Sequence, residues 1–424
     1  MVSASSFPVD GDRLWRTLSE LAEIGATPAG GVARVALTDE DLAGRDQFVA
    51  WVRALGCSVH IDQMGNLFAR RKGTDPDRLP VVIGSHLDSQ PTGGRFDGAY
   101  GVMVGLEILR VLAEGDISTA APIEVVSWTN EEGARFPPAM IGSGVYAGAF
   151  SLEEGLAAPG VDGTTLGAEL ARIGYDGPEP CGQPGGAGRR PIGHYIEPHI
   201  EQGPILEAAG ATLGAVTGVQ GIRWYDVTIE GQSAHAGSTP MEHRSDAMVS
   251  AALLVGEADA IARRRAPEGR ATVGTLVTGT GSRNTVAGTV ELTIDLRHPD
   301  AVELESMHGE LLAFATTERF AHGPGRGLPP RPTISQIWYS PPIVFDHAVV
   351  DAVRAGAAAA GFEPVDITSG AGHDACYVSM VAPTAMLFIP CADGLSHNEA
   401  ESILPEHATA GAQATLNAVL ALAG

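Results

Sequence analysis

Several side chains of the kinds that bind metals lie beside short apolar runs. His86 and Asp88 end the run LPVVIGSHLD, and Glu131 and Glu132 end the run APIEVVSWTNEEG. Asp97 lies between them, in RFDGAYG, just before a long apolar stretch. Histidine with carboxylate suits Zn, Mn, Co or Ni, and a shared carboxylate can bridge two ions that clamp both oxygens of a displacement. Singly each signal is weak, because a histidine at a strand end is more often structural and an acidic pair more often lies on a solvated face.

The apolar runs predict the elements that must position these residues. Residues 79–88 and 121–133 are typical of buried strands, and residues 98–115 of a long apolar helix. Strand, helix and strand in this order favour an α/β fold with a mostly parallel central sheet covered on both faces. In such sheets ligands bind beyond the carboxyl ends of the strands, which is where these side chains are expected.

The remaining pattern predicts a second domain inserted into the first. The expected strand, helix, strand, strand, helix and strand span residues 223–231, 245–264, 271–279, 289–298, 302–320 and 332–340. This is the ferredoxin-like order. We therefore expect a catalytic metal-binding domain of residues 1–216 and 340–424 and a dimerisation or lid domain of residues 217–339. Residues 156–191, rich in glycine and proline, are left without a predicted structure.

Composition excludes several classes of protein. The net charge of −24 argues against binding nucleic acid or anionic membranes, because phosphates would be repelled. No apolar run approaches the length of about 18 residues that a membrane helix needs. The first residues lack the basic and apolar regions of a secretory signal, and the 4 cysteines are scattered. These features predict a cytoplasmic protein with reduced thiols.

Seven motifs in order along the chain resemble one known family. They are GSHLDSQPTGGRFDGAYGV, SWTNEEGARFPPAMIGS, EPHIEQGPILE, GQSAHAGSTPM, NTVAGTVELTIDLRH, GAGHDA and SHNEAE. The family is the hydantoinase/carbamoylase branch of the dinuclear-zinc aminoacylase and carboxypeptidase superfamily. It includes N-carbamoyl-L-amino-acid hydrolase, allantoate amidohydrolase and zinc-type β-ureidopropionase.

The resemblance implies a ligand for each position of a two-metal site. The implied metal ligands, with Asp97 as the bridge, are His86, Asp97, Glu132, His199 and His397. Asp88 resembles the carboxylate that orients the His86 ring, and Glu131 resembles the general base. His199 marks the branch, because the peptidase branches commonly have a carboxylate there. Two divalent ions per chain are implied, zinc first, with manganese, cobalt or nickel as alternatives.

Other matches imply substrate contacts. His235 resembles the residue that contacts the scissile group, often across a dimer. The positions that resemble substrate-binding residues are Gln202, Asn284, Arg297, Gly372 and His373. Arg297 offers a two-pronged donor that suits a carboxylate, although an arginine on a strand would otherwise be read as a surface ion pair. The role of Glu399 in SHNEAE is left open.

The resemblance implies hydrolysis of the amide C–N bond of an N-carbamoyl amino acid, with release of amino acid, CO₂ and ammonia, by a homodimer. It also implies a cis peptide between Asp97 and Gly98. An aminoacylase or dipeptidase acting on N-acyl amino acids could use the same site, and so could an allantoate amidohydrolase. A non-catalytic binding protein is disfavoured, because all five ligand types and Glu131 are present.

Overall fold

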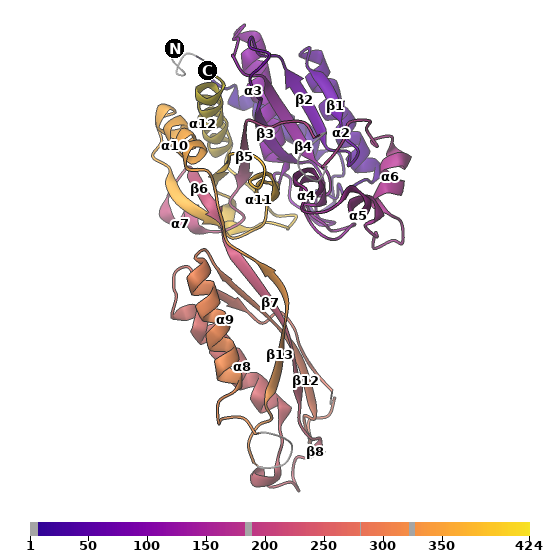
Figure 1. Cartoon of the computed structure of the whole chain (residues 1–424), viewed down its shortest axis with the longest axis vertical. Helices are drawn as coiled ribbons and strands as arrows, with labels where there is room; N and C mark the ends of the chain where they lie inside the picture. Colours follow the sequence, from indigo (N-terminus) through magenta and orange to yellow (C-terminus); the bar gives the residue numbers. More distant parts are fainter. Residues whose placement is uncertain (1–6, 183–188, 280, 322–326) are drawn as a thin grey trace. The chain divides into compact units, whose positions relative to one another are not determined.

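The computed structural model describes residues 7–182, 189–279, 281–321 and 327–424, which form two compact units. Unit 1 comprises Met1–Thr217 and Val344–Gly424, and unit 2 comprises Gly218–Ile343. Figure 1 shows both. None of the helices in these described ranges has the length and apolarity needed to cross a lipid bilayer.

Unit 1 is built on one sheet with the strand order β1-β2-β4-β3-β5-β16-β6-β14, and β15 pairs with β6. The strands are β1 (Ser58–Ile61), β2 (Leu67–Arg71), β3 (Val81–His86), β4 (Ile123–Trp128), β5 (His194–Ile200), β6 (Gly214–Val219), β14 (Ile343–Val344), β15 (Val365–Ser369) and β16 (Thr384–Ile389). The neighbours β4, β3, β5 and β16 run parallel, whereas the pairs β1–β2, β2–β4 and β16–β6 are antiparallel. β3, β4 and β16 are buried along their whole length, as expected of strands covered on both faces. The predicted α/β fold with a mostly parallel central sheet is confirmed.

Helices cover this sheet. They are α1 (Gly11–Ala22), α2 (Asp39–Ala54), α3 (Ala99–Glu114), α4 (Ile141–Ala147), α5 (Leu152–Ala157), α6 (Leu166–Ile173), α7 (Ile205–Ala209), α10 (His347–Ala359), α11 (Asp374–Val378) and α12 (Pro405–Ala423), with the short 3₁₀ turn η3 (Ala392–Gly394). The predicted apolar helix is α3, which is buried on almost every side against β3, β4 and β5. α2 begins at the predicted N-cap, where the Thr38 hydroxyl accepts a hydrogen bond from the Asp41 N–H. Part of the stretch 156–191 forms α6, while residues 183–188 lie outside the described part of the chain.

Unit 2 is an antiparallel sheet with helices on one face. Its strands are β7 (Gly221–Glu230), β8 (Ala234–His235), β9 (Arg270–Thr272), β10 (Leu276–Thr278), β11 (Thr285–Val286), β12 (Thr289–His298) and β13 (Pro332–Ser340), and its helices are α8 (Ala247–Arg263), α9 (Ala301–Ala315) and the 3₁₀ turn η2 (Met241–His243). The main sheet has the order β10-β12-β7-β13, with β9 also on β12. Buried and exposed side chains alternate along β7, and the buried ones pack with Leu254 of α8 and Leu311 of α9. Figure 1 shows α8 and α9 side by side on this face.

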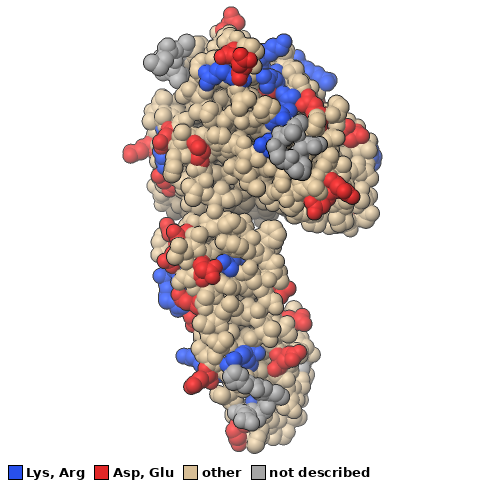
Figure 2. Space-filling model, viewed as in Figure 1, with Lys and Arg blue, Asp and Glu red and all other residues tan. Residues whose placement is uncertain are grey.

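The acidic excess is spread over the face of the molecule that Figure 2 draws. Aspartate and glutamate side chains lie there interspersed with lysine or arginine side chains on both units, and in unit 2 these are all arginines. The net charge of −24 therefore does not gather into one acidic patch on this face.

Candidate metal centre

The four parallel strands of unit 1 each bring a predicted ligand to the same edge of the sheet. His86 is the last residue of β3, Glu132 follows the end of β4, and His199 lies near the end of β5. His397 follows β16 after the η3 turn, and Asp97 precedes α3. Because the carboxyl ends of parallel strands meet at one edge, residues far apart in the sequence come together here.

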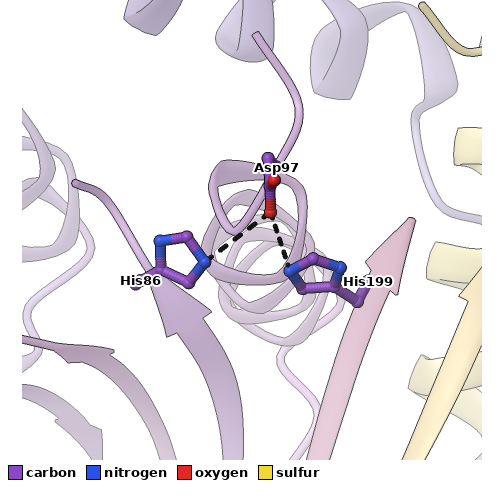
Figure 3. Close-up of side chains that lie close together, drawn as sticks. All are labelled: His86, Asp97 and His199. Carbon is purple, nitrogen blue, oxygen red and sulfur yellow. Dashed lines mark ion pairs between the residues drawn. The ribbon is translucent and has the colours of Figure 1, made fainter. Parts of the chain in front are cut away.

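Each carboxylate oxygen of Asp97 lies close to a separate group of metal-binding side chains. Its Oδ1 lies 3.2 Å from His199 Nε2 and 3.7 Å from His86 Nε2, and Figure 3 shows both rings turned toward it. Its Oδ2 lies 3.4 Å from His397 Nε2, which is 3.3 Å from Glu132 Oε2. All five predicted ligands therefore belong to two triads that share Asp97.

The hydrogen bonds of the histidines make these triads fit for metal ions. His86 Nδ1 is 2.8 Å from the Asp88 carbonyl oxygen, and His199 Nδ1 is 2.9 Å from the Ile200 carbonyl oxygen. Each Nδ1 therefore carries the proton and leaves the Nε2 lone pair aimed at Asp97, which is also an acceptor. Acceptors so placed are brought together either by a proton or by a metal ion between them. Two ligands, each about 2.0–2.1 Å from a tetrahedral ion, lie about 3.3 Å apart, close to the separations seen here.

The pKa values of the metal-free ligands agree with this reading. Burial lowers the pKa of His86 to about 4. Burial also acts to lower the pKa of His199, but its closer contact with Asp97 outweighs burial and raises that pKa to about 9. The hydrogen bond with Asp97 raises the pKa of His397 to about 9, and burial raises the pKa of Glu132 to about 8. In the metal-free chain at neutral pH, protons therefore occupy places where metal ions would bind.

Glu131 and Glu132 both face this centre because the chain turns irregularly after β4. Asn130 has a left-handed backbone (φ 55°), and the Asp88 carboxylate accepts hydrogen bonds from the N–H groups of Glu131 and Glu132, both at 3.2 Å. Glu131 Oε2 lies 3.6 Å from His86 Nε2 without belonging to either triad. Burial raises the pKa of Glu131 well above its usual range, and nearby carboxylates add to this.

Asp88 orients the His86 ring through its backbone carbonyl and not, as expected, through its carboxylate. Its backbone carbonyl accepts the His86 Nδ1 proton, whereas its carboxylate lies 4.0 Å from that nitrogen. The carboxylate instead holds the turn that carries Glu131 and Glu132. Asp88 thus links the two ligand-bearing turns through different atoms.

The predicted cis peptide between Asp97 and Gly98 is wrong for this structure. Among the described residues, only Pro138 and Pro267 follow cis bonds. The chain turns instead at Gly98, whose φ of 64° and ψ of −50° let the Ala99 N–H reach the Asp97 carbonyl at 2.6 Å. Only glycine fits, because a Cβ there would lie 2.3 Å from the His86 ring.

Three residues expected to bind substrate lie beside the triads. Gln202, with a left-handed backbone, donates from Nε2 to Asp97 Oδ2 at 2.8 Å, and its buried Oε1 has no hydrogen-bond partner in the described part of the chain. His373 is buried with its ring centre 4.5 Å from that of His199, and Nε2 is 3.0 Å from Ser369 Oγ. The neighbouring Gly372 leaves room for Met140, whose Cε would lie 3.0 Å from a Cβ there.

The other predicted residues belong to unit 2. His235 and Asn284 lie together, because β8 pairs with β11 and the Ala236 N–H donates to the Asn284 carbonyl at 2.9 Å. His235 Nδ1 accepts hydrogen bonds from the Gly237 and Ser238 N–H groups, both at 3.1 Å, which leaves the proton on Nε2. Arg297 lies on β12 and forms an ion pair with Asp295 at 2.8 Å.

Two supporting residues were missed by the sequence analysis. The buried Glu401 carboxylate accepts hydrogen bonds from the Phe96 and Asp97 N–H groups at 2.9 and 3.1 Å. Gln90 Nε2 donates to Glu132 Oε2 at 2.7 Å. Glu401 is the last residue of the motif SHNEAE, which also holds His397. A carboxylate so close to a predicted ligand was the sequence feature that could have indicated its role. Glu399 instead accepts a hydrogen bond from the Thr27 hydroxyl at 2.5 Å.

Comparison with known proteins gives consistent matches over the whole chain. Residues 82–421 match the profile of peptidase family M20/M25/M40. An N-carbamoyl-L-amino-acid amidohydrolase of Rhizobium meliloti is 45% identical, and the match covers 97% of this chain and 96% of the relative. An allantoate amidohydrolase of Bacillus subtilis is 32% identical over 90% of each chain. The crystal structure of an amidase of the hydantoinase/carbamoylase family from Burkholderia multivorans is 52% identical with a TM-score of 0.92, covering 99% of each chain.

Proposed function

Because the chain belongs to peptidase family M20/M25/M40 and has amidohydrolases among its relatives, we propose that it hydrolyses the amide C–N bond of N-carbamoyl amino acids. The products are the free amino acid, CO₂ and ammonia. The N-carbamoyl substrate is favoured over allantoate, because the relative named for N-carbamoyl-L-amino acids is 45% identical and the one named for allantoate 32%.

The observation that carries this proposal is the pair of donor triads joined by Asp97. We assign one divalent ion to His86, Asp97 and His199, and a second to Asp97, Glu132 and His397. Nitrogen and carboxylate donors together suit zinc, with manganese, cobalt or nickel as alternatives. When bound, two such ions acidify water and polarise the carbonyl group of the substrate.

Glu131 is the general base of the proposed reaction. It is buried, faces the triads and is not needed as a ligand. Its carboxylate takes a proton from the attacking water and then delivers that proton to the leaving nitrogen. The C–N bond breaks, and the released carbamate decomposes to CO₂ and ammonia. His235, whose proton is on Nε2, donates to the oxyanion that forms during attack.

Substrate binding is assigned to groups that keep hydrogen-bonding capacity. Gln202 Oε1 is buried without a hydrogen-bond partner in the described residues, so it suits a substrate N–H group. We assign the substrate carboxylate to Arg297 and Asn284, and contacts near the scissile group to Gly372 and His373. Arg297 would exchange its ion pair with Asp295 for the substrate carboxylate.

The test is a comparison of substrates together with metal analysis. Ammonia release and amino-acid formation are measured on the N-carbamoyl, N-formyl and N-acetyl forms of one amino acid, on N-carbamoyl-β-alanine and on allantoate. The highest kcat/KM on an N-carbamoyl amino acid is expected. A higher value on N-acetyl substrates would make the chain an aminoacylase, and no hydrolysis of any of them by metal-loaded protein would overturn the proposed function.

We also propose that unit 2 is a ferredoxin-like domain that forms a homodimer. Support for the fold comes from the strand and helix order and from the antiparallel sheet. Support for the dimer comes from apolar side chains on its helices, with Val249, Val302 and Leu312 exposed at 42%, 76% and 38%. A two-fold interface would cover the same helical surface on both copies.

A cytoplasmic location is proposed from the state of the cysteines. All four are buried free thiols. Such thiols are typical of proteins kept in a reducing compartment.

A further inference from the structure

Two buried arginines near the start of the chain have no role in the proposed reaction. Arg34 is 2% exposed, and Arg45, in α2, is 1% exposed. Arginine is almost never fully buried unless it is paired, so both positions need an explanation. Each contacts one of the two turns that carry metal-centre residues, although neither side chain belongs to a triad.

Arg34 fastens the turn that carries His86. Its Nε donates to the Leu87 carbonyl at 2.6 Å, and Leu87 lies between His86 and Asp88. Nη1 donates to the carbonyl of Leu21 in the last turn of α1 at 3.1 Å, and to that of Ile24, just after this helix, at 3.0 Å. The backbone also joins the two segments, because the Arg34 N–H donates to Ser89 Oγ at 2.8 Å and the Ser89 N–H donates to the Arg34 carbonyl at 2.9 Å.

Arg45 fastens the turn that carries Glu131 and Glu132. Its Nη2 donates to Thr129 Oγ1 at 3.3 Å, directly after β4, and its Nη1 donates to the Gly65 carbonyl at 2.8 Å. Its Nε forms a buried ion pair with Asp41 at 2.9 Å. The turn is therefore held from one side by Arg45 and from the other by the Asp88 carboxylate.

The surroundings of Arg34 are unusual for a structural arginine. Within the described residues, its guanidinium has hydrogen bonds only to backbone carbonyls, so no carboxylate pairs with it directly. A buried charge of this kind is costly unless something compensates for it. Burial accordingly lowers the pKa of Arg34 to about 10, although the charges of Asp41 and Asp88 act in the opposite direction.

We propose that Arg34 and Arg45 are positioning residues of the metal centre. Through hydrogen bonds to Leu87 and Thr129 they hold its two ligand-bearing turns in the positions at which the ligands can bind metal together. This proposal rests on the two-metal site of the proposed function. Arg34 sets the direction of His86, and Arg45 sets the turn that leads to Glu131 and Glu132.

Whether substitution of Arg34 weakens or tightens metal binding distinguishes a positioning role from a purely electrostatic one. A positive charge near a metal site repels metal ions, so removing it would tighten metal binding if charge were all that mattered. Loss of a group that orients a ligand instead weakens metal binding, by about 10–100-fold for partners outside the ligand shell. Arg34→Gln removes the charge, whereas Arg34→Lys keeps the charge and loses the planar fork.

The experiment is a Zn²⁺ titration of the metal-stripped full chain, in competition with a chromophoric chelator. Positioning predicts that both Arg34→Gln and Arg34→Lys raise the Zn²⁺ dissociation constant by about 10–100-fold. It also predicts that kcat falls more than KM rises, and that excess Zn²⁺ restores part of the kcat. Arg45→Lys should behave in the same way.

Two further variants guard against a trivial loss of folding. Gly44→Ala would place a Cβ 2.8 Å from Arg34 Cδ and so push the stem aside without removing any group of Arg34. Because alanine favours a helix over glycine, this variant should fold and still bind Zn²⁺ several-fold more weakly. Arg190→Lys is the matched control, because Arg190 is also largely buried in unit 1 but pairs with Glu124 and Glu179 away from the ligand turns.

The outcomes are distinct. Arg190→Lys is expected to lower only the melting temperature and to leave Zn²⁺ affinity unchanged. The proposal is overturned if the Arg34 variants and Gly44→Ala behave in the same way and bind Zn²⁺ as tightly as the unchanged chain does. It is also overturned if Arg34→Gln binds more tightly while Arg34→Lys is unchanged. If the unchanged chain itself binds no Zn²⁺, the proposed function fails instead.

Discussion

Exchanging Glu131 and Glu132 separately for glutamine should separate proton transfer from metal binding. Glu131 Oε2 lies 3.6 Å from His86 Nε2 and outside both triads, so Glu131→Gln leaves every proposed ligand in place. It removes the basic oxygen at a buried position that bulk water cannot replace. The expected loss in kcat is about 10²–10⁴-fold, or about 2.7–5.4 kcal/mol of barrier, with KM little changed.

Glu132→Gln should have the opposite profile. Glu132 Oε2 lies 3.3 Å from His397 Nε2 in the second triad, so the change removes one of three protein ligands of that ion. Metal affinity should fall by more than the about 10–100-fold expected for loss of an outer partner, and added metal should restore part of the activity.

The assay pairs metal content per chain, by elemental analysis after dialysis, with steady-state kinetics on an N-carbamoyl amino acid. Metal loss in Glu131→Gln with normal loading in Glu132→Gln would reverse the assignment. Near-normal turnover by Glu131→Gln would show that water is activated without this carboxylate.

Four other outcomes are expected. A chelator should abolish activity and Zn, Mn, Co or Ni should restore it, whereas full activity of verified metal-free protein would refute the two-ion centre. Zn²⁺ binding to the metal-free chain should release protons and tighten between pH 6 and 9, because His199 and His397 have pKa values of about 9 and must each lose a proton to bind metal. Calorimetry in several buffers measures the proton release, and an equal release at pH 7 and pH 10 would contradict this. Arg297→Ala should keep the metals and mainly raise KM, and a fall in kcat alone would argue against carboxylate binding. Light scattering at micromolar concentration should give a dimer, and a monomer would contradict the proposed interface.

The sequence predicted the sheet and the grouping of the triad residues because both follow from short-range patterns. Continuous apolar runs indicated buried parallel strands, and the carboxyl ends of such strands meet at one edge. His86, Glu132 and the intervening Asp97 were therefore expected together before any packing was known. The family resemblance then added His199 and His397 and made Asp97 the shared carboxylate, and the structure groups all five in two triads.

The supporting contacts could not be predicted in the same way. Charged side chains are usually exposed, so nothing in the sequence indicated that Arg34, Arg45 or Glu401 would be buried. The direction of the Asp88 carboxylate depends on where the chain turns at Asn130, which is a tertiary property. The cis peptide at Asp97–Gly98 was predicted from resemblance alone and is wrong, because the chain turns at Gly98 through its positive φ instead.

Because β16 lies between β5 and β6, the sheet of unit 1 stays incomplete until Thr384–Ile389 have left the ribosome, which happens after all of unit 2 has been synthesised. Unit 2 is one uninterrupted stretch and can fold earlier, since domains generally fold as units during synthesis. Until β16 arrives, β5, which is almost wholly buried in the finished fold, presents an unpaired edge, and such edges invite aggregation. Pairing with β16 thus covers this edge only late in synthesis, when unit 2 is already formed.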